Sequence, residues 1–265
     1  MKRDSFYLIS GWVLTIFSYI WLFLQGIQRS YFHQDDVIAL AVVANWQGWK
    51  TLFHLNNEHL NITFWPVLRI LWLNFGLNFS VYLAFSMLLH LLVLVLIFII
   101  TYKLTKSLLY SSLPVWGMVI NPNWFAVIWW IDGQMFILTT ISALISYWLI
   151  LKTKEHPSNF QYVLVYLISL LPGLSWGVGL VWPTLPLVVF GIDYKNKRLN
   201  RLGLVLLAAQ VSLIGIYKIL IGNNLVNTGI AAIGTIIFVK IFGPRPGAVI
   251  ATFVVTAVLV IFGEL

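Results

Sequence analysis

Residues Asn78–Tyr102 read NFSVYLAFSMLLHLLVLVLIFIITY, and this stretch decides the class of fold. It contains no Asp, Glu, Lys or Arg, and His90 is its only histidine. A helix of about 20 apolar residues is long enough to cross the hydrocarbon core of a bilayer. The stretch therefore predicts a transmembrane helix.

The composition of the whole chain agrees with this prediction. Hydrophobic residues make up 60% of the sequence and charged residues 9%, whereas a soluble domain carries about 25% charged residues. The absence of cysteine excludes disulfides, thiolate metal sites and a cysteine nucleophile. The net charge of +8 comes from small clusters between apolar stretches, so we expect membrane lipids and no nucleic acid as partners.

Hydropathy predicts an all-α integral membrane protein with about nine transmembrane helices. We expect one membrane-embedded domain over residues 1–265. Its predicted spans are Phe6–Ile27, Asn78–Tyr102, Leu108–Ile120, Met135–Leu151, Phe160–Leu171, Leu180–Ile192, Leu202–Ile221, Gly229–Phe242 and Gly247–Phe262.

The basic residues predict the orientation, because cytoplasmic loops collect Lys and Arg. With the N-terminus in the cytoplasm, the clusters at 103–106, 152–154, 195–201 and 240–245 all fall inside. Counting 62–77 as a span would move the first of these clusters outside. We therefore expect interfacial or re-entrant helices at Val37–Phe53 and Ile62–Leu77, both in the first outer loop. We expect the bacterial inner (plasma) membrane as the location, with the N-terminus in the cytoplasm and the active side periplasmic or extracellular.

Asp35 and Asp36 stand in the first outer loop, just before the predicted surface helix. Adjacent carboxylates near a bilayer are costly unless they are paired, hydrated or bound to metal, and their repulsion raises the proton affinity of one of them. The pair is thus a candidate general base and a candidate site for a divalent cation, magnesium or manganese. Either residue could instead cap the helix that begins at Val37.

Four further residues are candidates for the same site. Glu58 and His59 lie in a polar patch that is also compatible with an exposed turn. Arg69 interrupts an apolar stretch, where it could bind phosphate or a buried carboxylate, stack on a neighbouring tryptophan, or reach the headgroups. Asp132 follows a tryptophan-rich run and needs a partner in that apolar setting. We expect all six side chains to converge on one cavity that opens to the outer leaflet.

The order of these pieces resembles the polytopic glycosyltransferases of the GT-C fold, in particular the bacterial branch related to protein O-mannosyltransferases. The resemblance covers about residues 1–190, with additional spans over 202–265, and the chain stops at Leu265 where many relatives continue, which suggests a short form or a fragment. It rests on Asp35-Asp36, on Asn57-Glu58-His59 leading through Pro66 to Arg69-Ile70-Leu71, on Phe75–Tyr82 opening a span with His90, and on Asn121-Pro122 leading to Trp129–Gln134.

This resemblance implies an enzyme that transfers a sugar from a polyprenyl-phosphate-linked donor to a glycan, lipid or protein acceptor on the non-cytoplasmic face. It implies that Asp35 or Asp36 is the catalytic carboxylate and that Glu58, His59, Arg69 and Asp132 bind substrate or phosphate. The main alternative is a transporter or flippase of lipid-linked sugars, or another polytopic transporter. A membrane scaffold without chemistry is the third interpretation.

Overall fold

The computed structural model describes residues 3–29, 32–56, 59–153, 158–175, 192–193 and 198–199. The chain divides into two compact units. The first unit comprises Met1–His54 and Asn61–Leu144, and the second comprises Leu55–Leu60 and Ile145–Leu265. Each unit is described by itself.

Three helices are long and apolar enough to cross a membrane. They are α1 (Arg3–Arg29), with its apolar part at Ile9–Gln28, α5 (Phe79–Thr105) and α8 (Gly133–Lys152). With a rise of about 1.5 Å per residue, α5 is about 40 Å long. These helices confirm the first, second and fourth predicted spans.

Two further helices are apolar but shorter: α6 (Leu108–Val119) and α9 (Asn159–Ser175). At about 1.5 Å per residue, α6 covers only about 18 Å, and it contains Pro114. The predicted spans from Leu180 onward lie almost entirely outside the described residues. The structure therefore supports a helical membrane protein, while the count of nine spans stays a prediction.

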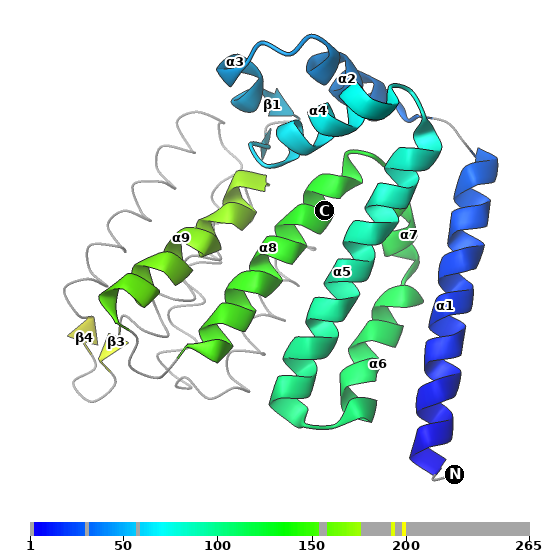
Figure 1. Ribbon diagram of the computed structural model, residues 1–265, viewed down its shortest axis with the longest axis vertical. Helices are drawn as coiled ribbons and strands as arrows, with labels where there is room; N and C mark the ends of the chain where they lie inside the picture. The colour runs from blue at the N-terminus through cyan, green and yellow to red at the C-terminus, as the bar shows by residue number, and fades with distance from the viewer. Residues whose placement is uncertain are drawn as a thin grey trace. The chain divides into compact units, whose positions relative to one another are not determined.

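The connection between α1 and α5 contains helices that do not run with the long ones, while its outer, interfacial or re-entrant placement stays a prediction. Helices α2 (Gln34–Ala44), α3 (Trp49–Leu52) and α4 (Phe64–Phe75) lie across the end where α1 stops and α5 starts (Figure 1). The predicted single helix over Val37–Phe53 is two helices, because the chain turns before Gly48, which has a φ of 62°. Only glycine adopts a positive φ without steric cost, so this turn ends the helical path.

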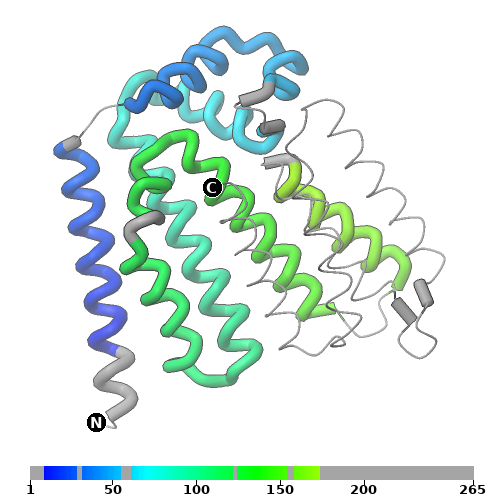
Figure 2. The backbone as a smooth tube through the Cα atoms, turned by 180° about the vertical axis from the view of Figure 1, so that it is seen from behind, coloured from blue at the N-terminus to red at the C-terminus, as the bar shows by residue number. Residues whose placement is uncertain are grey.

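The long helices of the first unit pack closely. Gly11 of α1 faces the indole of Trp116 on α6, and an added Cβ at Gly11 would lie 2.1 Å from a ring atom. Trp12 of α1 meets Phe98 of α5 edge to face, with ring centroids 5.7 Å apart. Seen from behind, α1 runs beside the segment that forms α6 and α7 (Pro122–Trp129) (Figure 2).

A second core joins the outer-loop helices to the rest of the first unit. Fully buried side chains of α2 and α4, among them Val43 and Trp65, pack with Tyr82 of α5 and with Ile131 just before α8. The indole nitrogen of Trp65 donates a hydrogen bond to the carbonyl of His54 at 3.0 Å. This core fixes the start of α2 next to the turn between α7 and α8.

The second unit contains the end of α8, α9 and four two-residue strands. Strands β1 (Leu55–Asn56) and β2 (His59–Leu60) form an antiparallel pair with Asn56 opposite His59. Strands β3 (Ile192–Asp193) and β4 (Arg198–Leu199) form another, with Asp193 opposite Arg198. Strands this short are turn-forming contacts rather than a sheet layer.

Candidate functional site

Asp36 is the best-anchored of the predicted site residues. Helix α2 begins at Gln34, which places Asp36 in its first turn as the third helical residue, and its side chain has no exposed surface. One carboxylate oxygen, Oδ2, accepts a hydrogen bond from the backbone N–H of His33 at 2.9 Å. The other, Oδ1, accepts from the backbone N–H groups of Ile131 at 2.8 Å and Asp132 at 3.2 Å.

These bonds connect two distant parts of the sequence. The contact with His33 satisfies a backbone donor at the start of α2, as the acidic residue of a capping box does. The contacts with Ile131 and Asp132 satisfy two donors in the turn before α8. The carboxylate of Asp36 is therefore a structural clamp between α2 and the α7–α8 turn.

The electrostatics of Asp36 reflect two opposed effects. Burial raises the pKa of this carboxyl, because a charge is costly away from water. The three backbone donors and the nearby His33 act in the opposite direction, but burial outweighs them and the pKa stays above its ordinary value.

Asp35 has a different environment, although it is adjacent. Successive side chains of a helix project about 100° apart, so the carboxylates of Asp35 and Asp36 point in different directions. Asp35 is half-buried, and its side chain makes no hydrogen bond within the part of the chain that the structure describes. It is the member of the pair that can meet a solute from outside.

Asp132 is brought next to this pair. Its side chain is fully buried, and its backbone N–H is one of the donors to Asp36. The turn that carries it is tight, since a Cβ on the next residue, Gly133, would lie 2.0 Å from the carbonyl oxygen of Val127. Only glycine fits there, and this residue fixes where Asp132 leaves the turn.

Arg69 lies at the other end of α2. Its guanidinium nitrogen Nη1 donates to the carbonyl oxygens of Val43 at 2.5 Å and Ala44 at 3.4 Å. The last carbonyls of a helix have no partner within the helix, and a cation at this end also interacts favourably with the helix dipole. Asp36 and Val43 are seven residues apart, or about 10 Å along the helix axis. Arg69 therefore caps α2 and is not grouped with the acidic residues.

For the two remaining predicted residues, Glu58 and His59, a place in this site stays a prediction. Glu58 lies outside the described residues. His59 belongs to β2 in the second unit, where it pairs with Asn56. Of the six residues expected to converge, Asp36 and Asp132 are joined by a hydrogen bond, and Asp35 is the neighbour of Asp36 in the chain. The described part of the chain contains no group of three or more His, Cys, Asp or Glu side chains that could hold a metal ion.

Sequence reasoning missed one partner of a buried polar residue. His90 of α5 forms an interhelical hydrogen bond, because its Nδ1 bonds the hydroxyl of Tyr19 on α1. The imidazole also lies between the rings of Tyr19 and Trp124, with centroids at 5.8 Å and 4.9 Å. In the sequence, only the hydroxyl of Tyr19 in the middle of an apolar span indicates that this residue needs a hydrogen-bond partner.

Comparison with protein families corrects the resemblance drawn from the sequence. The match found is to a transmembrane domain family, and it is not a glycosyltransferase family of the GT-C fold. The GT-C assignment and the expectation of an enzyme are therefore wrong. The physical reason is that the quoted motifs are short and rich in Leu, Trp and Phe, which membrane helices share. Their order therefore distinguishes one family of membrane proteins from another only weakly.

The apolar helices and this match agree that the chain is an integral membrane protein. No curated protein and no solved structure matches it. Residues 202–265, which are less than half of the chain and lie outside the described residues, are similar to the cyclin M transmembrane N-terminal domain.

Proposed function

We propose that this chain is a polytopic membrane transport protein whose cargo is a divalent cation. The observation that carries the proposal is the similarity of residues 202–265 to a transmembrane domain. The helices α1, α5 and α8 supply spans for such a protein.

The acidic residues at the start of α2 support a cation as the cargo. Asp35 and Asp36 lie in the first turn of α2, and Asp36 bonds the backbone of Asp132. The cations Mg²⁺, Ca²⁺ and Mn²⁺ prefer carboxylate, carbonyl and water oxygens. Asp36 already accepts three backbone hydrogen bonds, so we assign it the role of holding the site together. Asp35 is the carboxylate that we assign to first contact with the cation.

The geometry favours a cation that retains water. A Mg²⁺ ion usually keeps several waters and binds proteins through one or two carboxylates rather than through a full cage of ligands. The described residues offer Asp35 at the surface and no cluster of three ligating side chains. We infer that a hydrated ion meets Asp35 through its water shell, which gives weak binding and rapid release.

Transport by the purified full chain in proteoliposomes tests the proposal. A dye inside the vesicles reports entry of Mg²⁺, Ca²⁺ or Mn²⁺ added outside, and empty vesicles give the background. We expect entry above background, and a lower rate for Asp35→Asn. Asp193→Asn in β3 is the matched control, because it makes the same chemical change at a residue of the second unit to which we assign no cation, and it should leave the rate unchanged.

Two results would overturn this function. Entry of all three cations at the rate of empty vesicles would remove the transport assignment. Equal rates for wild type, Asp35→Asn and Asp193→Asn would keep transport but remove Asp35 from the cation path.

A further inference from the structure

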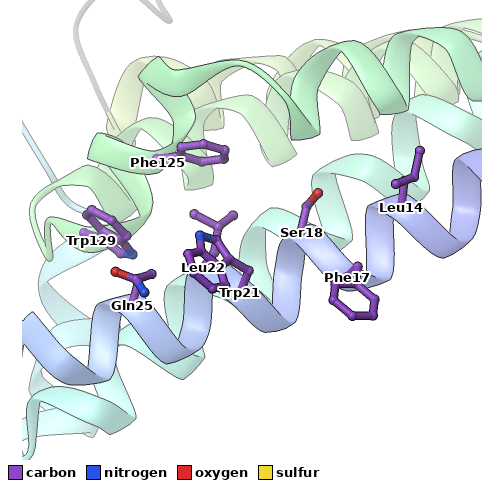
Figure 3. A pocket seen from close by; sticks show the side chains of 8 residues that line it. All are labelled: Leu14, Phe17, Ser18, Trp21, Leu22, Gln25, Phe125 and Trp129. Atoms are coloured by element: carbon purple, nitrogen blue, oxygen red, sulfur yellow. The ribbon is translucent and has the colours of Figure 1, made fainter.

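A groove lies between α1 and α7 in the first unit. Its wall includes Leu14, Trp21 and Gln25 of α1, and Phe125 and Trp129 of α7 (Figure 3). Its volume of about 440 Å³ is in the range of about 300–1,000 Å³ that is typical of ligand sites. The acidic residues discussed above do not line it, so it is a separate feature.

The groove opens toward the side of α1 that faces lipid. Leu14 and Trp21 are 67% and 62% exposed within the protein, on a helix whose length and hydropathy fit a membrane span. Apolar side chains with this exposure on a spanning helix are covered by hydrocarbon, because the bilayer core holds no other solvent. The groove is therefore a recess in the lipid-facing surface.

The polarity along the groove is uneven. Apart from Ser18, whose hydroxyl can bond a carbonyl of its own helix, the wall is apolar until Gln25. Gln25 is three residues before the end of the apolar stretch Ile9–Gln28, next to Trp129 in the close view (Figure 3). An amide offers both donors and an acceptor, so this end can bond the ester oxygens of a lipid.

The length of the groove fits one lipid chain. Leu14 and Gln25 are 11 residues apart, or about 16 Å along the helix. Half of a hydrocarbon core of about 30 Å is about 15 Å, the depth that one leaflet's acyl chains fill. A chain that enters beside Gln25 would thus end close to Leu14.

We propose that this groove binds one acyl chain of a bilayer phospholipid, with the chain lying along α1 from Gln25 toward Leu14, its first part against Phe125 and Trp129 of α7, and the ester region at the amide of Gln25. The site is a lipid-binding site on the membrane face of the protein. It does not depend on the proposed transport function, since the lipid is a resident of the surface and not the cargo.

Photochemical labelling of the full chain in lipid nanodiscs tests the proposal. The probe is a phosphatidylcholine with a photoactivatable group on its acyl chain, and the labelled peptides are mapped by mass spectrometry. We expect label on both α1 and α7, including the segment Phe125–Trp129. Ser18→Trp fills the groove from inside and should lower the label on α7 about tenfold, which corresponds to about 1.4 kcal/mol of lost affinity.

A matched variant separates filling from disturbance. Ile16→Trp adds an indole to an exposed position of the same helix that does not line the groove, and it should leave the α7 label unchanged. Equal melting temperatures of both variants in nanodiscs show that the helices stay packed. If Ser18→Trp does not fold, Gln25→Leu replaces it, with the expectation of weaker label on α7.

Three results would overturn the lipid site. The first is an α7 label no stronger than that of exposed positions elsewhere on the membrane face. The second is an α7 label that Ser18→Trp does not reduce. The third is cross-linking of the groove to a second copy of the chain without lipid label, which would assign the groove to a protein helix.

Discussion

The carboxylate of Asp36 accepts a hydrogen bond from the backbone N–H of Ile131, a residue 95 positions further along the chain, at 2.8 Å. A single buried side chain thus connects the first outer helix with the turn that starts α8. Because both of its oxygens accept backbone donors, the arrangement depends on an acceptor at each of these two atoms. The chemistry of this contact can be tested by an almost isosteric change.

Asp36→Asn should destabilise the fold. The amide places an NH₂ group where one carboxylate oxygen was, so at least one backbone N–H must face a donor. A buried donor left without an acceptor costs about 1–3 kcal/mol. Thermal unfolding of the detergent-solubilised protein, followed by circular dichroism, measures the change. Asp35→Asn is the matched control and should melt with the wild type, since Asp35 is half-buried and makes no described hydrogen bond. Equal melting of all three proteins would contradict the clamp.

The pH dependence of stability provides a second test of Asp36. Its pKa in the folded protein is raised above the ordinary value of 3.8, so between the two values the folded state holds more protons than the unfolded state. The free energy of unfolding therefore falls as the pH rises through that window, with a slope of at most about 1.4 kcal/mol per pH unit for one group. The stability of wild type relative to Asp36→Asn should be greatest at the acid side of the window. A difference that grows as the pH rises would show that the pKa is lowered instead.

The sequence predicted the long helices because hydropathy is a property of each segment alone. The helices α1, α5 and α8 coincide with runs of apolar residues, and the hydropathy of such a run does not depend on the rest of the chain. Helices in the connection between α1 and α5 were also predicted, whereas the placement of this connection on the outer side stays a prediction. The break of this connection near Gly48 was not predicted, because hydropathy indicates one helix over Val37–Phe53.

The candidate site was less predictable for a different reason. The partners of Asp36 and Arg69 are backbone groups, namely the N–H of Ile131 and the carbonyl of Val43. Every residue has such groups, so no side-chain pattern marks which of them a distant residue will meet. The sequence identifies charged residues whose burial in an apolar chain costs free energy. It does not show that the carbonyls at the end of a helix would accept the hydrogen bonds of Arg69.

Arg69 should contribute to stability through its hydrogen bonds to the end of α2. Arg69→Met keeps much of the apolar stem but removes the guanidinium, which leaves the carbonyls of Val43 and Ala44 without this donor. Hydrogen bonds to a charged group contribute about 1.5–3 kcal/mol, and we expect a loss near the lower end because Arg69 is only half-buried. Arg69→Lys should recover part of the loss, because an ammonium can still donate to one carbonyl. Unfolding in detergent at fixed pH measures all three proteins, and an Arg69→Met variant as stable as wild type would mean that water replaces the cap at no cost.

The contact between Gly11 and Trp116 predicts opposite outcomes for two chemically identical substitutions. Gly11→Ala places a Cβ 2.1 Å from the indole, so α1 and α6 must move apart, and overpacking of this kind costs about 1–3 kcal/mol. Gly117→Ala, one residue after that tryptophan, meets no atom within 4 Å and should be neutral or stabilising by up to about 1 kcal/mol, as alanine is the better helix former. The double variant Gly11→Ala with Trp116→Ala should lose less stability than the two single changes added together, because the smaller side chain makes room for the methyl group. If Gly11→Ala and Gly117→Ala change the melting temperature alike, the close approach of α1 and α6 at this point is not what holds the two helices together.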